Sequence, residues 1–362
     1  MLSTSLVLVV LAAISAEPRR ETVVKKTSDG TVRERAEVLV DEKGKIIYDG
    51  KQTKYFPNGK ESETVTFKMG VKSGPWTTWS TSGVKTAEGK YHFGLPDGVE
   101  TRYLNTGEKY LETSYRQGTR HGKQTHWYPS GAKSREANYV QGRLEGVLSE
   151  WYADGKPKLV EMYKNGQRNG SSTRWYDNGQ KRIETTFVGH KRQGPVKEWF
   201  RDGQSRLVAE FRNGALEGKM LAWHANGVPK MEGQFIDNER DGKWVEWNDK
   251  QIKISETNYI KGKTEGRQMF WHDNGQQKLE AMCKNGMREG SWNEWYENGQ
   301  VRGTGQYLHD RLEGTIRYWY EDGRQWSEQN FLSGQRHGEW KEWTQDDAPP
   351  KVHHYENGVQ TD

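Results

Sequence analysis

The stretch Gly170 to Gln193, GSSTRWYDNGQKRIETTFVGHKRQ, decides the fold. It predicts one strand that carries Trp175, a turn at Asn178-Gly179, and a second strand from Ile183 to Phe187. Asn-Gly between two alternating apolar runs is the strongest short-range hairpin signal, because both central residues of a two-residue turn need a positive φ. This stretch therefore predicts a β-hairpin.

The stretch recurs along most of the chain. A glycine returns every 24 residues from Gly50 to Gly338, which makes thirteen copies without an insertion over residues 50–361. A fixed period of this length indicates stacked structural repeats. We therefore expect an all-β, elongated repeat protein, an antiparallel hairpin meander of thirteen 24-residue repeats.

The repeat can be numbered from its leading glycine, which is repeat position 0. Position 5 is aromatic in all copies and position 17 in twelve, with Cys283 as the exception. Position 13 is often apolar, position 15 is often small, and position 14 is Glu in eight copies. Because side chains alternate along a strand, positions 13, 15 and 17 share one face, and we expect Trp175 at position 5 to pack there with Ile183 and Phe187.

Two turns set the expected register. A turn centred near position 8 places position 4 opposite position 12, so opposite charges face each other in the pairs Glu150–Lys158, Glu198–Arg206 and Glu294–Arg302. The second turn lies near position 20, which is Gly in ten copies. Asn238 and Asp310, which replace Gly in two copies, tolerate a left-handed backbone, and His190 is the third replacement.

The N-terminus differs from the repeats. Leu6 to Ala16 is an apolar run of signal-peptide length, followed by small residues suited to cleavage, so residues 1–16 are expected to be a signal peptide. The chain is then exported, to the periplasm, the cell envelope or the medium. Residues 17–49 contain a degenerate half-repeat, which we interpret as a cap because terminal repeats lack one neighbour.

Composition excludes several classes of protein. Only 32% of the chain is hydrophobic, but aromatic residues make up 12% and recur at fixed repeat positions, which disordered sequences do not show. The net charge of +5 is spread over interleaved acids and bases, so no nucleic-acid partner is expected, nor peripheral contact with a membrane. A single cysteine excludes an intramolecular disulfide.

The sequence contains no recognisable catalytic or cofactor-binding motif. The histidines do not show metal-ligand spacing, and His353-His354 is only a local concentration near two acids. No phosphate-binding loop or nucleophile elbow is present. The sequence therefore predicts no enzyme, no cofactor and no metal.

The repeat resembles that of a known family. The pattern Trp-x-x-Trp-Tyr-x-Asn-Gly-Gln followed by Tyr-x-x-Gly-x-x-x-Gly, clearest in Gly290 to Glu313, resembles the variant MORN repeat of bacterial YwqK-type antitoxin-like proteins. The resemblance covers residues 50–361. It implies a twisted, non-catalytic β-ribbon that serves as a scaffold or binding surface. The copies depart from the pattern at Asn248 to Gln251 and at Asp346 to Pro350.

Two interpretations of binding remain open. The ribbon is either a scaffold for an unknown protein partner or a glycan- or cell-wall-binding module with an aromatic ladder; an antitoxin-type binding protein is a further alternative. Aromatic residues outside the expected packed face are the candidate interaction face, since they lie an odd number of residues from position 5. They are Trp76, Trp244, Trp292 and Trp340 at position 2, and Tyr128, Tyr152, Tyr176, Tyr296 and Tyr320 at position 6.

Overall fold

The computed structural model describes residues 17–344 and 348–362. These residues form 33 strands, and neither range contains a helix, which confirms the predicted all-β hairpin fold. It follows that no described residue belongs to a helix of the length and apolarity that crossing a membrane requires. The expected signal peptide lies outside the described residues, so the predicted division into leader, cap and repeats stays a prediction.

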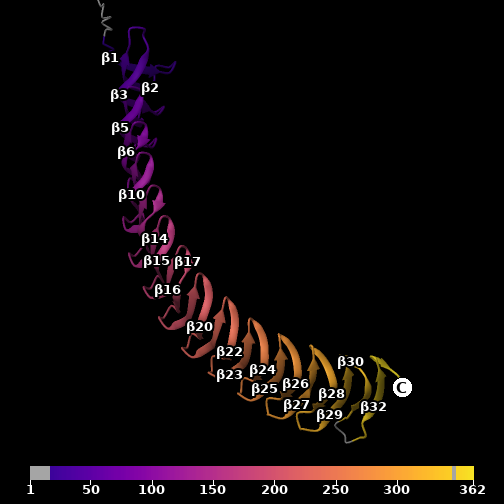
Figure 1. The fold of residues 1–362 in the computed structure, drawn as a ribbon. Helices are drawn as coiled ribbons and strands as arrows, with labels where there is room; N and C mark the ends of the chain where they lie inside the picture. The colour runs from indigo at the N-terminus through magenta and orange to yellow at the C-terminus, as the bar shows by residue number, and fades with distance from the viewer. Residues whose placement is uncertain (1–16, 345–347) are drawn as a thin grey trace, which may run out of the picture. The chain divides into compact units, whose positions relative to one another are not determined.

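Contacts divide the chain into two compact units, and β14 (Pro157–Lys164) contributes to both. In the first unit the strands pair antiparallel in chain order (Figure 1), except that the two-residue strands β7 and β12 share a partner with the strand that follows them: β6 pairs with β7 and β8, and β11 pairs with β12 and β13. The strands of this unit are β1 (Arg19–Lys26), β2 (Val32–Val40), β3 (Ile46–Tyr55), β4 (Glu61–Lys68), β5 (Val71–Trp79), β6 (Lys85–His92), β7 (Leu95–Pro96), β8 (Gly98–Tyr103), β9 (Lys109–Arg116), β10 (Thr119–Trp127), β11 (Lys133–Val140), β12 (Arg143–Leu144) and β13 (Gly146–Trp151).

The second unit has the same antiparallel pairing. Its strands are β15 (Gln167–Trp175), β16 (Lys181–Val188), β17 (Lys191–Arg192), β18 (Gly194–Trp199), β19 (Ser205–Arg212), β20 (Ala215–Trp223), β21 (Pro229–Ile236), β22 (Glu239–Trp247), β23 (Lys253–Ile260), β24 (Lys263–Trp271), β25 (Gln277–Lys284), β26 (Met287–Trp295), β27 (Val301–Leu308), β28 (Arg311–Trp319), β29 (Gln325–Leu332), β30 (Gln335–Arg336), β31 (Gly338–Glu342), β32 (Lys351–Glu356) and β33 (Val359–Gln360).

The register of a hairpin differs from the expected one by a single residue. In β15 and β16, Arg174 at position 4 pairs with Ile183 at position 13, whereas Trp175 pairs with Lys181. Arg182 at position 12 is therefore the extra residue of a β-bulge, which recurs in the other repeats. The predicted pairing of positions 4 and 12 is wrong, although Arg206–Glu198 (3.6 Å) and Arg302–Glu294 (2.8 Å) still form ion pairs.

The bulge decides which positions are packed. Positions 22, 2, 4, 13, 15 and 17 share one side of the sheet, which we call the core face. Positions 13, 15 and 17 pack on this face as predicted. The cluster in the second unit consists of Ala281, Trp292 and Ile316, and a β-carbon added to Gly305 would lie 2.9 Å from Trp292 Nε1. A tryptophan at position 2 thus fits because the neighbouring strand carries glycine.

Position 5 lies on the opposite side of the sheet. This side, which we call the tryptophan face, carries positions 1, 3, 5 and 14. Its aromatic residues, such as Trp175 and Trp295, are half-buried. The expectation that Trp175 packs with Ile183 and Phe187 is wrong, because a one-residue change of register moves a whole strand's side chains to the other face.

The two-residue turn lies at the other end of the hairpin from the one that the sequence predicted. At the Asn-Gly turn Gly179 has a φ of 94° while Asn178 stays outside the left-handed region, and Tyr176 N donates to Gln180 O, so the loop is longer than two residues. Gln251, in the copy without this glycine, adopts a φ of 65° and preserves the loop. The two-residue turn with two positive φ values lies at positions 19 and 20, where Asn238 and Asp310 are left-handed as predicted.

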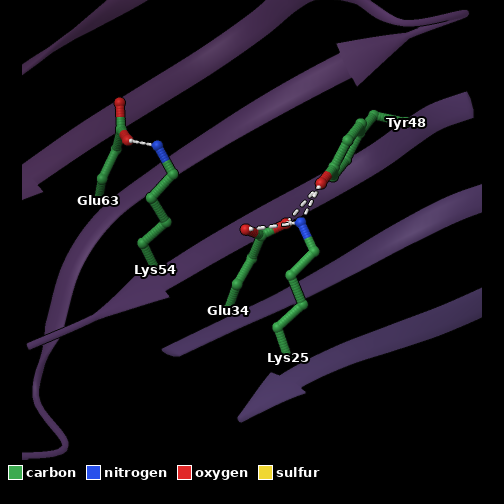
Figure 2. A network of polar contacts seen from close by, with 5 residues as sticks. All are labelled: Lys25, Glu34, Tyr48, Lys54 and Glu63. Atoms are coloured by element: carbon green, nitrogen blue, oxygen red, sulfur yellow. Dashed lines mark hydrogen bonds and ion pairs between the residues drawn. The ribbon is translucent and has the colours of Figure 1, made fainter. Parts of the chain in front are cut away.

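The first strands are joined by a polar network (Figure 2). Lys25 Nζ on β1 donates to Glu34 on β2 (3.2 Å) and to the Tyr48 hydroxyl on β3 (2.9 Å), and Tyr48 donates to Glu34 (2.6 Å). The hydrogen bonds to Tyr48 and Glu34 raise the pKa of Lys25. Burial alone would raise the pKa of Glu34, but hydrogen bonds from Tyr48, Gln52 and Lys25 outweigh it and lower that pKa.

Candidate binding surfaces

The predicted tryptophans at position 2 are core residues. Trp244, Trp292 and Trp340 are only 2–5% exposed, and Trp76 is half-buried. Trp244 Nε1 donates to Gln234 O (3.2 Å). The exposure expected of this group is therefore wrong. Positions 2 and 5 do lie on opposite faces, but the bulge makes the face of position 2 the packed one.

The predicted tyrosines at position 6 join successive repeats. All five are half-buried, and four hydroxyls donate to the position-5 carbonyl of the next repeat. These four bonds are Tyr128–Trp151 (2.8 Å), Tyr176–Trp199 (3.0 Å), Tyr296–Trp319 (2.9 Å) and Tyr320–Trp343 (2.9 Å). His224 and His272 contact the same carbonyls in their copies. Tyr152 is also half-buried, so the five tyrosines form no freely exposed face.

The asparagine at position 8 of the turn also joins successive repeats. Asn178 Oδ1 accepts from Gln180 N (3.1 Å), while its Nδ2 donates to Arg201 O in the next repeat (2.6 Å). The equivalent side chains Asn58, Asn226, Asn274 and Asn298 make the same contact 23 residues ahead. In these five copies one asparagine side chain therefore closes its own loop and bonds to the loop of the next repeat.

The tryptophan face is the surface that remains partly open. In four of the described copies a lysine at position 11 lies over the position-5 ring of the next repeat and forms an ion pair with Glu at position 14 of its own repeat. For Lys109 the nitrogen is 4.3 Å from the Trp127 ring centre and 2.8 Å from Glu112. Lys253 repeats this arrangement with Trp271 (4.9 Å) and Glu256 (2.8 Å). Aromatic and charged groups thus alternate along this face.

Tyrosine can replace tryptophan in this arrangement. Tyr103 lies at position 5, under Lys85 at 5.7 Å, and donates a hydrogen bond to Glu88. Burial and then the hydrogen bond to Glu88 raise the pKa of Tyr103 to about 12. Its hydroxyl is therefore a donor throughout the physiological pH range.

The tryptophan face of the second unit contains a hollow of about 460 Å³ between β20, β21, β22 and β23. Its walls include Val245, Trp247 and Lys219, with Glu256 between Lys243 (2.6 Å) and Lys253 (2.8 Å). Burial alone would raise the pKa of Glu256, but its two lysine hydrogen bonds outweigh burial and lower that pKa. The hollow has the volume of a side-chain or small-ligand site.

A second cavity, about 400 Å³, opens on the core face of the second unit around Ser172. Arginine dominates its lining, and its residues are absent from the predicted set. The signal was present in the sequence, since Ser172 occupies a position that holds tryptophan or a branched aliphatic residue in many copies. The incorrect register hid it by placing position 2 on the exposed side.

Chemistry other than binding has little support in the described ranges. They hold no group of three or more His, Cys, Asp or Glu side chains that could bind a metal ion. His354 contacts Asp362 (3.2 Å), and part of the acidic segment before it lies outside the described residues. Cys283 is 6% exposed, and burial raises the pKa of its thiol, so it is a packed side chain and not an activated nucleophile.

Comparison with known proteins finds a similar repeat in part of the chain. Six segments match the model of the MORN repeat variant, namely residues 48–69, 120–141, 144–165, 168–188, 216–237 and 288–309. The antitoxin-like subfamily is not confirmed. A comparison with curated proteins found no match.

Solved structures resemble the chain only weakly. Crystal structures of TcdB2-TccC3-Cdc42 and of TcdB2-TccC3 match with 10% and 11% identity and TM-scores of 0.17 and 0.18. Each match covers 85% of this chain but only 20% of the other chain. Similarity at this level carries no argument about function.

Proposed function

We propose that this chain, six segments of which match the MORN repeat variant, is a non-catalytic, exported repeat scaffold that binds a protein partner through its tryptophan face. The observation that carries the proposal is the recurring unit of a half-buried Trp, a Lys over its ring and a Glu paired with that Lys. Tryptophan with a surrounding polar rim is the composition of protein interfaces.

The lysines favour a protein over a glycan. A sugar ring stacks on an uncovered aromatic face, whereas Lys109 and Lys253 already lie over Trp127 and Trp271. A protein partner can instead exchange the Lys–Glu pairs for its own charges and place apolar groups in the hollow beside Trp247. Repetition also suits a protein partner, because several repeats contribute to one extended contact.

Export is supported by the apolar run from Leu6 to Ala16 and the small residues at its end. N-terminal sequencing of protein from its native host should find a chain that begins near Ala16 or Glu17. A full-length chain recovered from the cytoplasm would contradict this part of the proposal.

Binding is tested with the full mature chain as bait and extracts of the envelope and medium as the source of partners. Trp247→Ala should lose the partner, because Trp247 forms a wall of the hollow. Trp319→Ala is the matched control, since it changes the same repeat position in a copy that does not line this hollow. Cross-links from the partner should map to Lys219, Lys243 and Lys253. Equal retention by both variants, or capture of polysaccharide in place of protein, would refute the proposal.

A further inference from the structure

The cavity around Ser172 exists because side-chain volume is missing from the core face. Ser172 pairs with Thr185 across β15 and β16, so two small polar residues meet where Trp292 and Gly305 meet in a later repeat. Both side chains are buried, at 4% and 5% exposure, yet they leave a space of about 400 Å³. This copy has therefore replaced the packed core with a polar cavity.

Positive charge surrounds the cavity. Five arginines and two glutamates line it, a formal surplus of three positive charges. Two arginines are neutralised, since Arg174 lies 3.4 Å from Glu161 and Arg206 lies 3.6 Å from Glu198. The other three are Arg168, Arg182 and Arg192, and no carboxylate of the described residues lies within ion-pair distance of them.

Each of these three arginines lies over an aromatic ring. The Arg168 guanidinium lies 5.0 Å from the Phe187 ring centre, and Arg192 lies 5.2 Å from that of Phe211. Stacking on a ring leaves the N–H groups at the guanidinium edge free to donate. Arg182 is the extra residue of the bulge; it lines the cavity, and its guanidinium lies 5.8 Å from the Tyr176 ring centre.

The floor of the cavity contains an unused hydrogen-bond donor. Ser172 Oγ donates to Glu161 (3.0 Å), but the buried Thr185 Oγ1 has no partner within the part of the chain that the structure describes. Buried hydroxyls are nearly always hydrogen-bonded, because an unmade bond is costly. An acceptor oxygen of a ligand in the cavity would satisfy Thr185.

The spacing of the arginines selects among anions. Arg168 and Arg192 occupy the same position in neighbouring repeats, and two strands at about 4.8 Å each place neighbouring repeats roughly 10 Å apart. A compact anion such as phosphate reaches only one of them. A polyproline II segment presents every third side chain on one side, at intervals of about 9 Å.

We propose that this cavity, lined by Arg168, Arg182, Arg192 and Thr185, binds an extended acidic peptide segment with a carboxylate at every third residue. The arginines pair with successive carboxylates, and Thr185 donates to one of them. The site lies on the face opposite the tryptophan face, so it is independent of the function proposed above.

The test uses the full chain and a fluorescein-labelled peptide of four Glu-Pro-Pro triplets in a fluorescence anisotropy titration. The peptide should bind, while the same peptide with Gln for Glu should not. Arg168→Gln and Arg192→Gln should each weaken binding about tenfold, the loss of one charged hydrogen-bonded contact. Arg288→Gln is the matched control, because Arg288 occupies the same repeat position but is paired with Asp310 (3.2 Å).

Two further variants separate binding from folding. Thr185→Val removes the hydroxyl at constant shape, so it should weaken the peptide while leaving the thermal midpoint unchanged or higher. Ser172→Leu fills the cavity and should abolish binding in a folded protein. Unchanged binding in Thr185→Val and Ser172→Leu would overturn the proposal. Displacement of the peptide by inorganic phosphate at matched ionic strength, or tighter binding to phosphatidylserine vesicles that the same variants lose, would also overturn it.

Discussion

Replacing Trp292 by alanine measures how much of the stability resides on the core face. Trp292 is 5% exposed and packs with Ala281 and Ile316. A tryptophan buries about 150–250 Å², which at about 25 cal/mol/Å² corresponds to about 4–6 kcal/mol. Measured Trp→Ala costs are about 3–5 kcal/mol. Gly303 and Gly305 line the ring and supply no side chain to fill the space, so the cost should lie in the upper part of that range.

Trp295→Ala is the control three residues away. Trp295 lies on the tryptophan face and is half-buried, so water enters the vacated space and the expected cost is about 1–2 kcal/mol. Urea unfolding followed by circular dichroism gives both values. Because repeats are coupled only to their neighbours, Trp292→Ala should also produce a separate early transition. Hydrogen exchange should locate that transition in β25 to β28.

The outcome is decisive for the assignment of the two faces. A cost for Trp295→Ala equal to or above that for Trp292→Ala would mean that position 5 carries the core. It would also mean that the register with position 2 opposite position 15 does not describe the protein in solution. The reasoning from the bulge would then be refuted.

Three further predictions concern single side chains. Tyr296→Phe removes the hydroxyl bonded to Trp319 O, which should cost about 0.5–1.5 kcal/mol in urea unfolding; an unchanged midpoint would contradict a joining role. Burial, and then the charge of Arg135, lower the pKa of His126 below its ordinary 6.5, so the unfolded chain takes up a proton more readily than the folded one. Stability should therefore be complete above about pH 6.5 and fall as the pH drops below it, and His126→Gln should flatten that dependence in melts across pH; an equal slope in both proteins argues against it. Cys283 should react slowly with a thiol reagent at pH 7 and rapidly in urea, whereas fast labelling of the native chain would show that it is accessible.

The period and the hairpins could be predicted because they depend on local signals. A glycine at 24-residue intervals and left-handed residues at position 20 suffice to place the strands, and the structure confirms them at Asn238 and Asp310. The register could not be predicted in the same way. It depends on one extra residue at position 12. The residue type there, such as Arg182, does not distinguish a bulge from a regular strand.

The error in register propagated to the candidate site. With position 4 opposite position 12, Trp244 and Trp292 fall on the exposed face, whereas the true register buries them. The cavity around Ser172 could not be predicted for the same reason, because a serine is ordinary on a solvent-exposed face and informative only at a core position. Contacts between repeats were equally hidden, since a tyrosine that bonds to a carbonyl 23 residues later leaves no local signal.

The side-chain hydrogen bonds that join successive repeats end on main-chain carbonyl oxygens, and this affects how the sequence of such a chain can vary. Tyr296 and Asn298 donate to carbonyl oxygens of the next copy, atoms that every amino acid provides. Whichever residues a copy carries at positions 2 and 15, its neighbour can still attach to it. Copies can therefore be duplicated, deleted or exchanged as 24-residue modules while each one diverges in what it displays.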